Sequence, residues 1–228
     1  MIEQQLSLPH VVRRPAKQDG APPMLVLLHG YGSNEHDLFG LAPYLDERLL
    51  IVSARAPLTL MPGGYAWFHL GFEQTGGISF DLPGMLHQVD RVATFVEEAA
   101  TAYGADPKRV FLGGFSQGAI MTAVTLVRRP GLLAGALMLS GALFPEAQAQ
   151  TLPPDFKPEA LAGVPVLITH GTHDPVLPVA LGRALRSLLE RYPVELTYRE
   201  YPMAHEINLD SLRDVADWLR ARVSAPLP

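Results

Sequence analysis

A serine in a glycine-bracketed turn is the residue of this sequence that most directly suggests chemistry. Ser116 lies at the centre of Gly114-Phe115-Ser116-Gln117-Gly118, between the apolar segment 110–112 and a longer apolar segment that begins at residue 119. A strand that turns at once into a helix crowds the backbone, and glycines two residues either side of the apex relieve that crowding. The pattern predicts a nucleophilic serine, and a glycine-rich turn that serves packing alone is the alternative reading.

A hydroxyl nucleophile needs a base, and the base needs an orienting acid. Asp174 follows the apolar segment 164–170, and His205 follows the alternating segment 194–201. The order serine, aspartate, histidine is that of the α/β-hydrolase triad. We therefore expect His205 to take the proton from Ser116 and return it to the leaving group, while Asp174 fixes the imidazole tautomer. Taken singly, the aspartate could be a turn residue and the histidine a structural one.

Two other arrangements of these side chains were weighed. Glu206 could replace Asp174 as the acid, but sequence neighbours rarely point at each other's ring, so Asp174 is preferred. His170, His173 and Asp174 carry the donor atoms of a zinc or iron site. His170 and His173 stand three positions apart, a spacing that brings both rings onto one face only in a helix, whereas His170 ends an expected strand. The sequence therefore predicts neither a metal site nor a cofactor.

A second glycine-rich loop is expected to stabilise negative charge on the substrate. His29-Gly30-Tyr31-Gly32 follows the uninterrupted apolar segment 24–28. We assign the oxyanion hole to the backbone amides of Tyr31 and Gln117. Loss of one such donor typically costs about 10²–10³ in rate. His29 itself is expected to be a structural hydrogen-bonding residue and not the base.

The elements that must position these residues alternate along the whole chain, which implies a mostly parallel sheet with helices on both faces. We expect one α/β domain over residues 1–228, with its core at about 24–223. Segments 57–79 and 145–162 read as loops. The expected strands are 24–28, 50–54, 110–112, 134–141, 164–170 and 194–201, with a short edge strand within 6–14; the expected helices start near 34 and cover 82–103, 119–127, 179–191 and 209–223.

Composition excludes several functional classes. The 228 residues carry a net charge of −5 and no run of lysine or arginine, which argues against nucleic acid as a partner. The chain has no cysteine, so a disulfide, a thiolate metal site and a cysteine nucleophile are all excluded. No segment resembles a membrane span, and the first residues lack the features of a signal peptide. A cytoplasmic location is the expectation.

Five segments together resemble the phospholipase/carboxylesterase family of α/β hydrolases, which includes bacterial carboxylesterases and acyl-protein thioesterases. They read HGYGSNEHD, GFSQGA, LSGAL, HGTHDPVLP and PMAHEI. The resemblance spans the chain from about residue 25 to residue 219. It implies hydrolysis of carboxylic esters or thioesters without a cofactor, with Ser116, Asp174 and His205 as the triad. A homodimer is compatible with it, because many members of that family are homodimers.

Two departures from the thioesterase pattern favour the bacterial esterase branch. Residues 31–34 read Tyr-Gly-Ser-Asn where the thioesterases have Leu-Gly-Asp, and Glu206 and Ile207 follow the histidine where they have small or polar residues. We expect a small-molecule substrate, namely a small to medium apolar carboxylic ester. A thioesterase or lysophospholipase with the same triad is the alternative. A non-catalytic binding protein of the same fold is the alternative from another class.

Aromatic and apolar side chains near the expected strand ends are candidates for the substrate pocket. Trp67 and Phe68 are assigned to the acyl or alcohol wall, and a hydrophobic plug that only packs against the core is the alternative for both. Leu177 and Met203 stand close to the acid and the base in sequence and are assigned to the same pocket.

Overall fold

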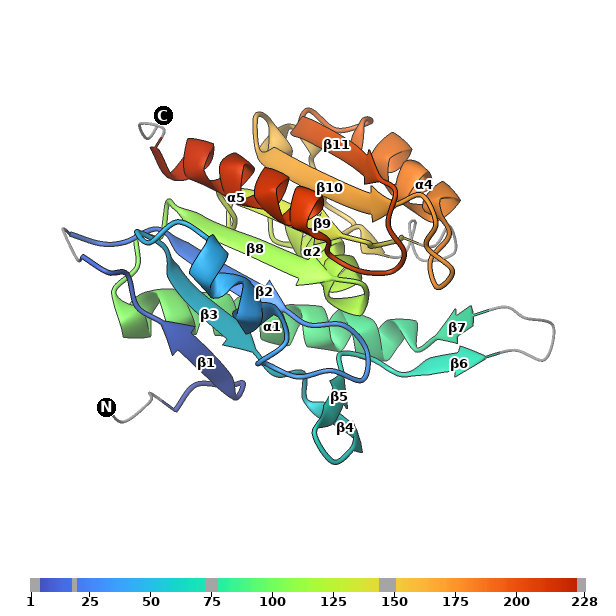
Figure 1. The fold of residues 1–228 in the computed structure, drawn as a ribbon, viewed down its shortest axis with the longest axis horizontal. Coiled ribbons are helices and arrows are strands. Elements are labelled where there is room, and N and C mark those ends of the chain that lie inside the picture. Colours follow the sequence, from blue (N-terminus) through green and yellow to red (C-terminus); the bar gives the residue numbers. More distant parts are fainter. Residues whose placement is uncertain (1–4, 18–19, 73–77, 144–150, 225–228) are drawn as a thin grey trace.

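The computed structural model describes residues 5–17, 20–72, 78–143 and 151–224, and within them the main sheet has seven strands. Their order across the sheet is β1-β3-β2-β8-β9-β10-β11, as Figure 1 shows. Their bounds are β1 (His10–Arg13), β2 (Met24–Leu28), β3 (Leu50–Ala54), β8 (Val110–Phe115), β9 (Gly135–Leu139), β10 (Pro165–Gly171) and β11 (Glu195–Tyr201).

The strand order reverses between β2 and β8. β1 is an antiparallel edge strand against β3, and the other strand pairs of this sheet are parallel. The chain passes from β2 to β3 on one side and later returns with β8 on the other side of β2. In open sheets of this kind, ligands bind beyond the carboxyl ends of the strands at this reversal. The loops after β2 and β8, which carry Tyr31 and Ser116, meet there.

Helices cover both faces of the sheet (Figure 1). One face packs on α1 (Leu82–Tyr103), α2 (Gln117–Arg128) and α4 (Val179–Leu189), and the other on the 3-10 helix η1 (Leu38–Tyr44) and on α5 (Leu209–Ser224). Strand β2 contributes Val26 to the first core and Leu25 to the second, as the alternation of side chains along a strand requires. None of the described helices is both long and apolar enough to cross a membrane.

The mostly parallel sheet between two helical layers confirms the expected fold class, with differences in some local elements. The helix expected from residue 34 is the short 3-10 helix η1, which contains Pro43. The expected loop 57–79 contains two antiparallel strand pairs, and its residues 73–77 lie outside the described residues. The paired strands are β4 (Leu58–Met61) with β5 (Gly64–Ala66), and β6 (Leu70–Phe72) with β7 (Ile78–Phe80). Strands of three or four residues are too short to give a readable alternation. Residues 145–150 of the second expected loop, 145–162, lie outside the described residues, and η2 (Pro158–Leu161) forms a 3-10 turn within it.

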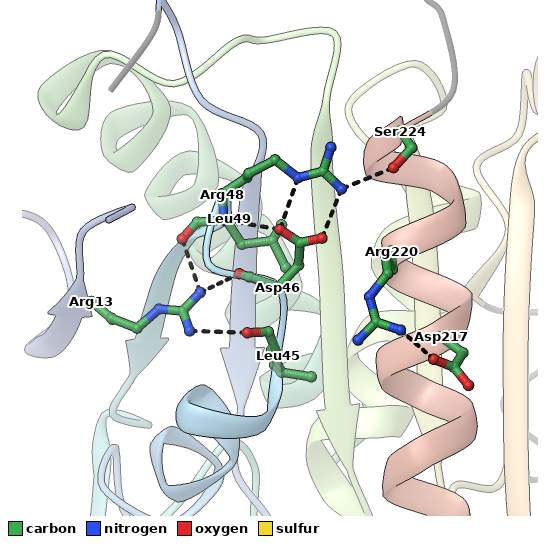
Figure 2. A network of polar contacts seen from close by, with 8 residues as sticks. All are labelled: Arg13, Leu45, Asp46, Arg48, Leu49, Asp217, Arg220 and Ser224. Atoms are coloured by element: carbon green, nitrogen blue, oxygen red, sulfur yellow. Dashed lines mark hydrogen bonds and ion pairs between the residues drawn. The ribbon is translucent and has the colours of Figure 1, made fainter. Parts of the chain in front are cut away.

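A polar network ties the N-terminal edge strand to the C-terminal helix (Figure 2). The Arg13 guanidinium donates to the carbonyl oxygens of Leu45, Asp46 and Leu49 at 3.3, 2.6 and 3.1 Å. The Arg48 guanidinium donates two hydrogen bonds to the Asp46 carboxylate, at 2.9 and 2.7 Å, and one to the Ser224 hydroxyl at 2.8 Å. The loop before β3 is therefore hydrogen-bonded both to β1 and to the last residue of α5.

Candidate active site

Ser116 occupies a strained backbone position between β8 and α2. Its φ of 53° and ψ of −114° lie in a region that L-residues rarely adopt. The flanking glycines allow this turn, because a Cβ atom on Gly118 would lie 2.0 Å from the Leu28 carbonyl oxygen and one on Gly114 would lie 2.2 Å from Gly118. The two glycines of the motif are thus required by close backbone approach, and the turn presents the serine at the edge of the sheet.

The three residues expected to form a triad lie within hydrogen-bonding distance of one another. His205 Nε2 is 2.9 Å from Ser116 Oγ, and His205 Nδ1 is 2.7 Å from Asp174 Oδ2. Since a carboxylate accepts, Nδ1 carries the imidazole proton, and Nε2 is left to accept from the serine hydroxyl. The ring of Phe115 packs on the imidazole with centroids 4.8 Å apart. The geometry is that of a nucleophile, a base and an acid connected in series.

The loops that carry the acid and the base are brought together at the end of β10. A Cβ atom on Gly171 would lie 2.3 Å from the carbonyl oxygens of both Met203 and Ala204, so only glycine permits this approach. The His173 amide donates to the Met203 carbonyl at 3.1 Å. Asp174 and His205 therefore face each other from the loops that follow two adjacent parallel strands.

The Asp174 carboxylate is buried and fully engaged. Its side chain has no exposed surface, and its Oδ1 accepts from the amides of Val176 and Leu177 at 2.9 and 2.8 Å. The Leu177 carbonyl is in turn 2.7 Å from Nε2 of His170, a ring that is also completely buried. His205 pairs with Asp174 and not with the neighbouring Glu206.

The two histidines of the possible metal site differ in burial and in hydrogen bonding. His170 is buried and bonded to the backbone, whereas His173 is exposed. In the described part of the chain, no three histidine, cysteine or acidic side chains form a group that could hold a metal ion. His170 instead bonds to the Leu177 carbonyl in the loop that carries Asp174, a contact that no sequence pattern indicates.

The two residues whose backbone amides are assigned to the oxyanion hole lie beside the same pocket as the serine. Both Tyr31 and Gln117 line the pocket that contains Ser116. Within the described residues, neither amide donates a hydrogen bond to another protein group. Free amides beside a nucleophile are what a developing oxyanion requires.

The loop that carries Tyr31 is held by buried hydrogen bonds. The Ala56 amide donates to His29 Nε2 at 3.0 Å, which places the ring proton on Nδ1, 2.7 Å from the Gly30 carbonyl. Burial lowers the pKa of His29, so the ring stays in this neutral form. The Gly32 amide donates to the Tyr65 carbonyl at 2.8 Å. The hairpin β4–β5 thus serves as a support for the loop.

Trp67 and Phe68 lie beneath the site and not in its wall. Both side chains are buried, with exposures of 0% and 1%, and neither is among the described residues that line the pocket. The Gln117 side chain joins them, since its Oε1 accepts from the Trp67 amide and its Nε2 donates to the Phe68 carbonyl, each at 2.8 Å. The indole Nε1 donates to the His29 carbonyl at 2.9 Å. These contacts connect the two segments that bear the candidate oxyanion amides.

The pocket beside Ser116 has a volume of about 310 Å³ and a largely apolar wall. Leu177 lines it, as expected, whereas Met203 is buried in the loop before His205 and is not among the lining residues. The sequence also predicts Tyr31, Gln117 and His205 at the site. Sequence patterns alone do not identify the other members of the wall, because the wall comes from five separate segments. The remaining described lining residues are Gly30, Ser33, Asp37, Leu70, Phe115, Ile120 and Val176.

Comparisons with known proteins agree with this geometry. The model of the phospholipase/carboxylesterase family matches residues 10–223. The acyl-protein thioesterase 1 of Kluyveromyces lactis is 26% identical over 223 residues, which cover 92% of this chain and 96% of the relative. Among solved structures, the carboxylesterase of Bacillus cereus is 26% identical with a TM-score of 0.76, covering 95% of each chain. The carboxylesterase of Mesorhizobium loti is 26% identical with a TM-score of 0.79, covering 96% of this chain and 97% of that one. This chain therefore belongs to the phospholipase/carboxylesterase family of α/β hydrolases.

Proposed function

We propose that this chain is a serine carboxylesterase that hydrolyses small to medium apolar carboxylic esters. The observation that carries the proposal is the continuous series of hydrogen bonds from Asp174 through His205 to Ser116, which ends in an apolar pocket. Family membership supports the same reaction class. No cofactor enters the proposal, because the three side chains and two backbone amides supply each chemical role.

The first half of the reaction forms an acyl-enzyme. Ser116 Oγ attacks the ester carbonyl while its proton passes to His205 Nε2, and the carbonyl π electrons move onto oxygen. The amides of Tyr31 and Gln117 donate to that oxyanion. Asp174 stabilises the imidazolium without taking its proton. The tetrahedral intermediate then collapses, the bond to the alcohol oxygen breaks, and His205 gives the proton to the departing alcohol.

The second half reverses these roles with water as the nucleophile. His205 takes a proton from water, and the resulting hydroxide equivalent adds to the acyl carbon. On collapse, the bond to Ser116 Oγ breaks and the proton returns to that oxygen. The carboxylic acid is released, and the resting hydrogen-bond series is restored.

Covalent labelling and a substrate panel test this proposal. A fluorophosphonate probe should label the wild-type protein and not Ser116→Ala, and the variant should lose up to about 10⁶ in kcat while it unfolds at a similar temperature. A chain-length series of p-nitrophenyl esters should show turnover that is highest for short to medium acyl chains. Absence of both labelling and turnover in folded wild-type protein would leave the non-catalytic reading.

An acyl thioesterase is the second candidate, because the Kluyveromyces lactis relative that aligns over 92% of this chain is an acyl-protein thioesterase. The same triad cleaves either bond, and the two functions differ in the leaving group. Comparing kcat/KM for an ester and a thioester of the same acyl group separates them. A strong preference for the thioester would replace the esterase proposal.

Location and assembly complete the proposal. We propose a cytoplasmic location, with which the absence of cysteine is compatible, since the fold needs no oxidising compartment. Fractionation of cells that express the chain tests this point. A homodimer is proposed from family resemblance, and light scattering on the purified protein gives its mass directly.

A further inference from the structure

We propose that Asp37 makes the pocket selective for neutral and cationic esters over anionic ones. This inference rests on the proposed esterase function and specifies its substrate class. Asp37 lines the pocket that holds Ser116, and among the described residues of that lining it is the single carboxylate, while none of them is lysine or arginine. The charge that a bound substrate meets in this wall is therefore negative.

The Asp37 carboxylate is exposed at the pocket and hydrogen-bonded to a second lining residue. The Ser33 hydroxyl donates to Asp37 Oδ2 at 2.8 Å. Asp37 precedes the 3-10 helix η1, but its side chain makes no capping hydrogen bond to that helix. One carboxylate oxygen thus remains for a substrate group.

No cation compensates Asp37 within the described part of the chain, where it forms no ion pair. Two nearby carboxylates behave differently. Glu35 is bound by both donors of Arg55, at 2.8 and 2.7 Å. Asp174 is enclosed by hydrogen bonds to His205 and to two amides. Asp37 is the carboxylate among these three that is free to act on a ligand.

An unpaired charge in a concave apolar wall acts more strongly on a ligand than the same charge on an open surface, because low-dielectric walls focus the field. An ester whose alcohol or acyl part carries an ammonium group is attracted. An ester that carries a carboxylate or phosphate is repelled. This disfavours phosphate-bearing substrates such as lysophospholipids, which is the alternative that the triad by itself leaves open.

Two pairs of isosteric substrates test the proposal. Butyrylcholine and 3,3-dimethylbutyl butyrate have the same shape and differ by one positive charge. The monoanion of 4-nitrophenyl hydrogen adipate and neutral 4-nitrophenyl 6-methylheptanoate have the same number of heavy atoms and differ by one negative charge. For each pair the measured quantity is the ratio of the two kcat/KM values, so effects common to both substrates cancel. The variants are Asp37→Asn, which removes the charge but keeps the shape, and Asp210→Asn as a control on the exposed surface of α5.

We expect Asp37→Asn to lower the cation-to-neutral ratio about twofold to fivefold and to raise the anion-to-neutral ratio similarly, as for one partly screened charge. Asp210→Asn should move neither ratio. In the wild type, both ratios should move in the same directions as ionic strength rises from about 0.01 to 1 M, because screening weakens the field. If neither kcat/KM ratio changes with the Asp37→Asn substitution or with ionic strength, the proposed role of Asp37 is wrong. If the variant does not fold, the salt series on the wild type tests that role. Failure of the wild type to cleave either neutral ester would instead reject the esterase function.

Discussion

His170 and Leu177 form a buried hydrogen bond of 2.7 Å between the imidazole Nε2 and the carbonyl oxygen. The amide of the same leucine donates to the Asp174 carboxylate at 2.8 Å. The orientation of the acid therefore depends on a residue that touches neither the base nor the nucleophile. His170 is a positioning residue for Asp174.

Replacing His170 by alanine should lower kcat about 10-fold to 100-fold while KM changes less than twofold, because a shift of about 1 Å in the acid loop has effects of this size. The unfolding free energy should also fall by about 1–3 kcal/mol, since the Leu177 carbonyl loses its buried partner. Steady-state kinetics and urea unfolding give both values.

Leu185→Ala is the matched control for His170→Ala. Leu185 is also completely buried, on α4 in the core on that side of the sheet, and its apolar side chain cannot hydrogen-bond to the loop that carries Asp174. It should lose stability but keep kcat. Equal kcat losses in the two variants would mean that His170 acts through stability alone.

The backbone of Ser116 predicts an unusual effect on stability. Its φ of 53° is costly for any residue with a Cβ atom, and such strain costs about 1–3 kcal/mol. Ser116→Gly should therefore unfold at higher urea concentration than Ser116→Ala, although both are inactive. An alanine variant as stable as the glycine variant would show that the turn stores no such strain.

The choice of acid is tested by Asp174→Asn. The amide would force His205 into the wrong tautomer, and we expect a loss of about 10⁴ in kcat with the fold intact. Glu206→Gln is the matched control and should stay close to wild type. A nearly active Asp174→Asn together with an inactive Glu206→Gln would reverse the assignment.

An ion pair between α4 and β11 makes a contribution to the free energy of unfolding that depends on pH. Two donors of Arg183 bind the Glu200 carboxylate at 2.7 and 2.8 Å and lower the pKa of Glu200 to about 2. Because this pKa is lower in the folded protein than in the unfolded chain, the contribution is present above about pH 4.3 and is lost as the pH falls toward 2.

Arg183→Gln should thus lower the unfolding free energy slightly at pH 7, as is typical of a largely exposed ion pair. The difference from wild type should shrink as the pH falls below 4.5, as urea unfolding at a series of pH values would show. The more exposed Arg213–Asp210 pair is the comparison, and Arg213→Gln should cost less. A cost for Arg183→Gln that stays constant down to pH 2 would contradict the assignment.

The sequence predicts the sheet and the meeting of its reactive residues because both follow from strong local rules. Uninterrupted apolar strands such as Met24–Leu28 must be covered on both faces, and parallel strands bring their carboxyl ends to one edge. Ser116, Asp174 and His205 do lie within hydrogen-bonding distance, while their roles in turnover stay a prediction.

What the sequence does not reveal are relations that depend on packing. An aromatic pair such as Trp67 and Phe68 looks the same whether it lines a pocket or fills a core, and here it fills the core. The supporting role of His170 and the exposure of Asp37 to the pocket depend on contacts between segments that no periodicity reports. The wall of the site is assembled from loops whose relative placement is settled only by the folded chain.

The hydrogen bonds between Gln117 and the Trp67–Phe68 backbone affect which mutations can alter the activity of this protein during evolution. They couple the interior beneath the pocket to the amides expected to receive the oxyanion. A substitution that reshapes the space around the indole would tune reaction speed without altering any surface that a substrate meets. Variants with a faster or slower turnover could therefore arise from mutations that leave molecular recognition as it was.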